Sequence, residues 1–118
     1  MSLDFRLGLL EQSGQMSSKV KENIEAIRTF FIDDAGIELI EENGSRFITH
    51  VVMALGRIER EEPVEALDDE AFEEFKESDV FEKATDMTDR LVGILSFDIP
   101  ESEIKYFIIN ICLILDED

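Results

Sequence analysis

Residues 47–58 read FITHVVMALGRI, and their apolar residues recur at the spacing of an amphipathic α-helix. This stretch contains the single histidine of the chain, His50, and Arg57 follows it by seven residues. Each helical residue turns the chain by about 100°, so seven residues return it to within about 20° of its starting direction. We therefore predict that His50 and Arg57 share one stripe of a helix. An imidazole can accept a phosphoryl group or a proton, and a guanidinium on the same stripe can hold the resulting anion.

Helical periodicity continues on both sides of this stretch, and the chain contains only two prolines. We expect Asn43-Gly44-Ser45 to interrupt the chain before the His50 helix, and Pro63 to end any helix before it. Asp79 is expected to cap a later helix, with Glu82 completing a capping box. The predicted helices span about 17–33, 45–60, 69–77, 80–95 and 100–115, and residues 1–16 form a short helix or a loose arm. The expected fold is all-α, an antiparallel bundle of about five helices over 17–118.

Composition narrows the possible functions. At 118 residues the chain has the size of one domain, and its 44% of hydrophobic residues can build a core. The net charge of −18 repels nucleic acid and anionic lipid, so partners should be neutral or basic proteins or metal ions. The longest apolar segment, residues 106–115, is too short to span a bilayer. It contains the only cysteine, Cys112, which we interpret as a core residue. We find no signal peptide, and we expect a cytoplasmic protein.

The order of these motifs resembles the PRD, the phosphotransferase-system regulation domain. That family has a first half with a helix that carries His and, seven residues later, Arg, as His50 and Arg57 do here. Its second half ends in a helix that opens with Pro and acidic residues, as Pro100, Glu101 and Glu103 do here. The resemblance covers about residues 20–116, most of the chain.

The resemblance implies a transcription-linked regulatory module of the sugar phosphotransferase system, not an enzyme, with no cofactor and no metal. It implies that His50 accepts a phosphoryl group from the phosphocarrier protein HPr or from a sugar-specific EIIB, that Arg57 stabilises the anion, and that the chain forms a homodimer. Two features depart from the family pattern. Asn110 stands where the last helix often has a second His, and the chain has no room for a nucleic-acid-binding domain. We therefore expect a free-standing module that acts through protein contacts.

Each of these residues also has a simpler interpretation. His50 could be a residue at the edge of the core, hydrogen-bonded to a neighbour. Arg57 could pair with one of the 29 acidic residues, an exposed contact that contributes at most about 1 kcal/mol. Asn110 must find hydrogen-bond partners if buried, and it could face the same cleft as His50 or bond across a dimer interface.

Acidic residues in the second half allow a different function. Glu73, Glu74 and Glu77, followed by Asp86 and Asp89, loosely resemble the carboxylate pattern of all-α, magnesium-dependent nucleotide pyrophosphohydrolases of the MazG type. Carboxylates three or four residues apart share a helix face and can bind Mg²⁺ with water molecules. In a chain this acidic, a solvated acidic face would give the same spacing.

Overall fold

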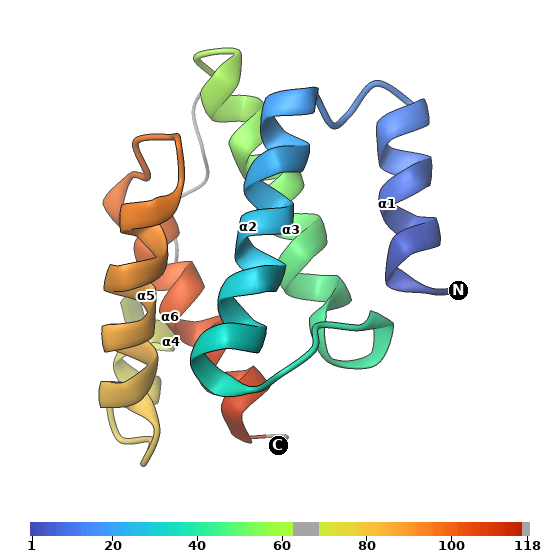
Figure 1. Ribbon diagram of the computed structural model, residues 1–118. Helices are drawn as coiled ribbons and strands as arrows, with labels where there is room; N and C mark the ends of the chain where they lie inside the picture. Colours follow the sequence, from blue (N-terminus) through green and yellow to red (C-terminus); the bar gives the residue numbers. More distant parts are fainter. Residues whose placement is uncertain (63–68, 117–118) are drawn as a thin grey trace. The chain divides into compact units, whose positions relative to one another are not determined.

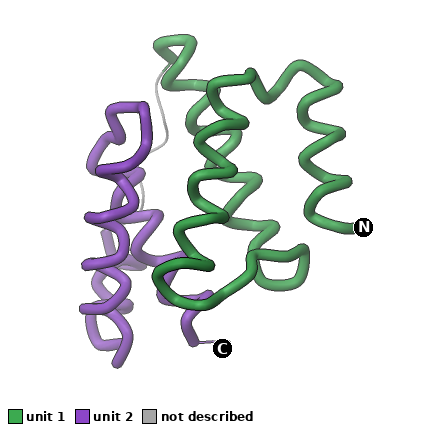
Figure 2. The backbone as a smooth tube through the Cα atoms, viewed as in Figure 1, with its two compact units in different colours: residues 1–63 green, residues 64–118 purple. Residues whose placement is uncertain are grey.

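The structure is a computed structural model that describes residues 1–62 and 69–116, and within these ranges it contains six helices and no strand. The helices are α1 (Leu3–Gln12), α2 (Ser18–Ala35), α3 (Glu41–Glu59), α4 (Asp69–Phe75), α5 (Phe81–Ile94) and α6 (Glu101–Asp116) (Figure 1). The chain divides into two compact units, residues 1–63 and 64–118 (Figure 2). The first unit therefore contains α1 to α3, and the second contains α4 to α6.

Local signals account for the ends of α2, the helix that precedes the His50 helix. The Ser17 hydroxyl accepts a hydrogen bond from the backbone N–H of Val20, which satisfies one of the free donors in the first turn. Gly36 ends the helix in the left-handed region with φ of 66°, a conformation that glycine adopts without a side-chain clash. The chain then turns, so that α3 runs back alongside α2 (Figure 1).

The core of the first unit lies where α2 meets α3. The two helices contribute apolar side chains at helical spacing, and the Phe31 and Phe47 rings meet edge to face with centroids 6.3 Å apart. Fully buried side chains are Val20, Ile24, Ile27 and Phe31 from α2 and Phe47, Ile48, Val51, Val52 and Leu55 from α3. This packing fixes which side of α3 faces inward, and therefore which side is left for solvent.

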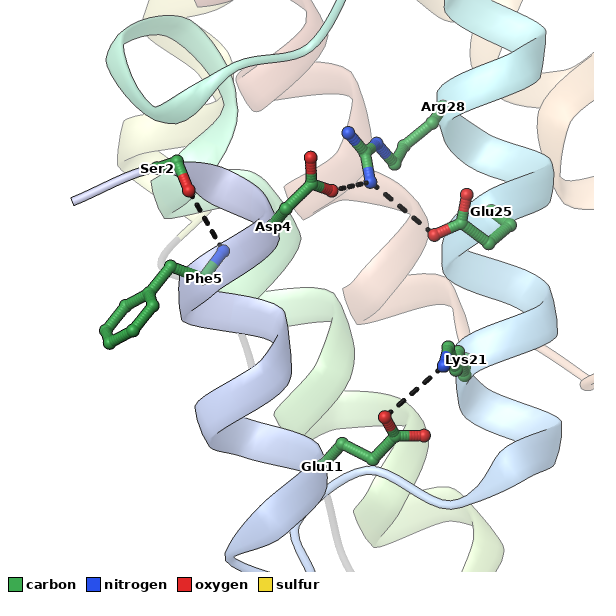
Figure 3. A network of polar contacts seen from close by, with 7 residues as sticks. All are labelled: Ser2, Asp4, Phe5, Glu11, Lys21, Glu25 and Arg28. Atoms are coloured by element: carbon green, nitrogen blue, oxygen red, sulfur yellow. Dashed lines mark hydrogen bonds and ion pairs between the residues drawn. The ribbon is translucent and has the colours of Figure 1, made fainter.

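Helix α1 is attached to the first unit by two buried leucines and by ion pairs. Leu3 and Leu7 are buried, while Asp4 accepts a hydrogen bond of 2.8 Å from Arg28 of α2. A second pair, Glu11 and Lys21, joins the other end of α1 to α2 at 3.3 Å (Figure 3). α1 also contacts α3. The segment expected as a short helix or a loose arm is therefore a docked helix.

In the second unit, α6 contacts both α4 and α5. α5 and α6 run antiparallel (Figure 1), and α4 joins them through Phe72, whose ring lies 5.7 Å from that of Phe81. Lys105 of α6 lies over the Phe72 ring and also pairs with Asp69 at 3.2 Å. Buried residues of this unit include Ala84, Met87, Leu91, Phe107, Ile111 and Cys112. Cys112 is thus in the core, as its sequence context predicts.

The all-α prediction is confirmed, but two predicted helix boundaries are wrong. α3 begins at Glu41, so Asn43 and Gly44 lie inside its first turn instead of interrupting the chain before it. α5 begins at Phe81 after Val80, without a side-chain cap, so the predicted capping box of Asp79 and Glu82 does not form. Pro63 lies outside the described residues. Within the described ranges, no helix has both the length and the apolar character needed to cross a membrane.

Candidate functional site on α3

The candidate site lies on the solvent-facing side of α3. This helix has a strongly amphipathic pattern, and its inner side is buried from Phe47 to Leu55. At about 100° per residue, Arg46, His50, Met53 and Arg57 fall within about 60° of one another on the opposite side. We call these four residues the α3 face. The predicted arrangement of His50 and Arg57 on one helix is therefore present.

The two predicted residues differ in exposure. His50 is half-buried at the edge of the helix, whereas Arg57 is exposed. The Arg57 guanidinium makes no ion pair with any residue that the structure describes. The sequence left open whether Arg57 pairs with a carboxylate, and among the described residues it does not.

The first turn of α3 holds the helix in place. Asn43 accepts a hydrogen bond of 2.8 Å from the backbone N–H of Ile40 and donates one of 3.0 Å to the carbonyl of Glu38. Beside it, Glu41 accepts hydrogen bonds from the Arg6 guanidinium of α1, one of them at 3.0 Å from Nε. These bonds lower the pKa of the Glu41 carboxyl group below its usual range. The helix that carries His50 is thus tied to α1 at its N-terminal end.

Asn110 lies in the second unit, within α6. Its side chain is buried, and its Nδ2 donates a hydrogen bond of 3.0 Å to the carbonyl of Tyr106, one turn earlier in the same helix. This bond satisfies one amide donor locally, in the way that buried polar groups require. The prediction that Asn110 neighbours His50 stays a prediction.

The acidic residues of the rival hypothesis are engaged differently from metal ligands. Glu73 pairs with Lys76 at 2.8 Å within α4 and the turn that follows it. Asp86 pairs with Arg90 at 2.9 Å within α5. Across residues 1–62 and 69–116, no three His, Cys, Asp or Glu side chains gather in a group that could hold a metal ion. The described residues therefore offer no ready-made metal-binding group for the magnesium-dependent alternative.

Two members of the α3 face, Arg46 and Met53, were missed by the sequence reasoning. Arg46 is exposed and, like Arg57, makes no ion pair with a described residue. Met53 keeps 42% of its surface exposed. A signal for both was present in the sequence. Between Glu42 and Glu59 the chain has no acidic residue for 16 positions, although 29 of its 118 residues are acidic.

Comparison with known proteins places these features in a family. The model of a family described as "PRD domain" matches residues 19–112, which include α2, α3, α4, α5 and most of α6. A protein of Haemophilus influenzae described as uncharacterized is 35% identical over 71 residues, which are 59% of this chain. The aligned part is 57% of that relative, so the chain spans little more than half of its length. No solved structure matches the chain.

Proposed function

We propose the function of this protein from one premise, that the chain belongs to the PRD family. PRD domains are regulatory modules linked to the sugar phosphotransferase system. We propose that His50 is the phosphorylated residue of this chain and that Arg57 stabilises the phosphoryl group. The observation that carries the proposal is the α3 face, where the half-buried His50, the only histidine of the chain, shares a stripe with Arg57, which is exposed and makes no ion pair with a described residue.

The chemistry needs few groups. Transfer from a phosphohistidine donor breaks one phosphorus–nitrogen bond and forms another at a ring nitrogen of His50, which must present its lone pair. HPr carries its phosphoryl group in this way, and a sugar-specific EIIB is the other candidate donor. In a helix, long side chains generally lean toward the N-terminal turn, so we expect the Arg57 side chain to lean toward Met53 and His50. A guanidinium so placed can donate charge-assisted hydrogen bonds to phosphoryl oxygens.

The regulatory output follows from charge. Phosphorylation adds about 1.5 to 2 negative charges at neutral pH to a protein that already carries −18. The new dianion repels nearby carboxylates and attracts Arg57, which shifts helix packing or the contacts made by α3. We propose that the protein acts through such contacts, with a second copy or with another protein, without binding nucleic acid.

The decisive experiment is phosphorylation with purified components. We expect that phosphoenolpyruvate, enzyme I and HPr add one acid-labile phosphoryl group to the wild-type protein, measured as intact mass. His50→Ala should gain none. Arg57→Gln should be phosphorylated more slowly and should lose the group faster. Absence of a mass gain on the wild type, or the same gain on His50→Ala, would refute the assignment.

Self-association is a separate part of the proposal. A homodimer must overcome the repulsion between two chains of −18 each, so association should strengthen as salt screens the charges. Light scattering at tens of micromolar protein, measured across salt concentrations, tests this. A monomer at every salt concentration would contradict the dimer and leave the role of His50 untouched.

A further inference from the structure

The residues around His50 have the composition of a protein–protein interface. Interface centres are enriched in Arg and Met and depleted of Lys, Glu and Asp compared with the rest of a protein surface. The exposed residues of the α3 face beside His50 are Arg46, Met53 and Arg57. Lys, Asp and Glu are all absent from positions 43–58 of this highly acidic chain. The α3 face therefore lacks the acidic side chains that a chain with a net charge of −18 is expected to expose on the rest of its surface.

The absence of ion pairs between Arg46 or Arg57 and any described residue also indicates a binding surface. Eight of the eleven Lys and Arg side chains have an interaction partner, whereas Arg46, Arg57 and Lys83 make no ion pair with a described residue. Carboxylates are close at hand in sequence, since Glu42 lies one turn before Arg46 within α3, and Glu61 follows Arg57 by four residues, just beyond the end of the helix. Neither arginine pairs with them. Two guanidinium groups that make no ion pair with a described residue lie on one face of a chain with a net charge of −18, and together they can attract an anion.

We infer that the α3 face is the docking surface for the phosphorylated donor protein, and that Arg46 and Met53 hold this partner without acting on the transferred group. The partner presents its phosphoryl dianion in a surface that is otherwise neutral or basic, because a strongly acidic surface would be repelled by the rest of this chain, whose net charge is −18. This inference rests on the proposed function of His50 and goes beyond it by adding the residues that recognise the donor.

The direction of the helix separates the tasks of the two arginines. From the general tendency of helical side chains we expect Arg57 to lean back toward His50, where it could contact the phosphoryl group during transfer. Arg46 lies one turn before His50, and by the same tendency we expect it to lean away from the ring, toward the start of α3. Its guanidinium is therefore placed to contact the rim of the partner. Met53, between His50 and Arg57 on the stripe, supplies the flexible apolar contact at the centre.

Two phosphoryl donors of different size test the inference. Phosphorylated HPr presents a protein surface, and phosphoramidate presents a phosphoryl group alone. We compare Arg46→Gln and Met53→Gln with wild type, following the mass gain on His50 over time. The controls are Lys83→Gln, which removes another exposed charge that makes no ion pair with a described residue, and Ile94→Gln, which changes another exposed apolar residue. Both controls lie in α5 of the second unit. Circular dichroism verifies that every variant is folded.

With phosphorylated HPr, we expect each α3 variant to lower kcat/KM about tenfold, mainly through a higher KM. A tenfold change corresponds to a loss of about 1.4 kcal/mol in binding free energy, which is typical of an interface residue that contributes to binding. With phosphoramidate, the same variants should stay within about twofold of wild type, and the controls should match wild type with both donors. If the α3 variants match wild type with HPr, or lose rate equally with both donors, the docking role is refuted while phosphorylation of His50 stands. If the wild type gains no phosphoryl group from either donor, the proposed function fails, and this inference with it.

Discussion

Helix α1 offers a matched pair of substitutions that measures how firmly it is docked. Leu7 is 7% exposed and Leu9 is 45% exposed, although they lie two residues apart in the same helix. Leucine-to-alanine changes at both positions alter helix propensity equally, so their difference reports burial alone. Leu7→Ala removes three carbon atoms from a buried site, which costs about 2.4 kcal/mol at about 0.8 kcal/mol per carbon. The cavity can partly collapse at the edge of the unit, so this value lies near the lower end of the usual range of about 2–5 kcal/mol.

Leu9→Ala should cost about 1.2 kcal/mol, half of the value for Leu7, because about half of that side chain is already in water. The assay is urea unfolding followed by circular dichroism, with hydrogen exchange of the α1 amides as a local measure of the same change. In thermal unfolding, we expect Leu7→Ala to lower Tm by about 10 °C and Leu9→Ala by about half as much, about 5 °C. Equal effects of the two substitutions would refute the docking of α1 through Leu7.

Three further predictions concern other groups of the first and second units. Hydrogen bonds from Arg6 lower the pKa of Glu41. This contact therefore stabilises the fold above the ordinary glutamate pKa of about 4.3, and the stabilisation is lost as pH falls through the lower pKa of the folded state. Glu41→Gln should reduce the dependence of the unfolding free energy on pH in that acid range, measured by urea unfolding at each pH. Burial raises the pKa of Cys112 to about 11, so iodoacetamide at pH 8 should label the native protein far more slowly than the urea-unfolded protein, and equal labelling would contradict its place in the core. The Thr49 hydroxyl is buried without a hydrogen-bond partner among the described residues, so Thr49→Val should raise stability by about 1 kcal/mol, and a loss of that size would indicate a partner.

The sequence predicts most of the fold because the helices are amphipathic. The apolar residues of α2 and α3 follow the 3.6-residue period, and those on one side of each helix, such as Ile24 and Val51, are buried. The errors occur at helix starts, where capping side chains compete. Asn43-Gly44 has the composition of a turn, yet the Asn43 side chain binds the backbone on the N-terminal side and extends the helix. Such a contact depends on local geometry that spacing alone does not reveal.

The candidate site was predictable in part for the same physical reason. His50 and Arg57 share a stripe because their spacing is close to two helical turns, and this follows from the sequence once the helix is accepted. Which other residues join them depends on exposure and on ion pairing, and neither can be obtained from spacing. Arg46 could have paired with Glu42 one turn away, and the structure shows that it does not.

The hydrogen bonds of Asn43 also affect how the protein ages chemically. An Asn-Gly sequence is prone to deamidation, because the glycine nitrogen attacks the asparagine amide with little steric hindrance. Here the Gly44 N–H donates a hydrogen bond of 2.8 Å to the carbonyl of Ile40, and both ends of the Asn43 amide are bonded to the backbone. The reacting groups can meet only when the first turn of α3 opens. The rate at which Asn43 deamidates in a stored sample therefore measures how often the first turn of the helix that carries His50 opens.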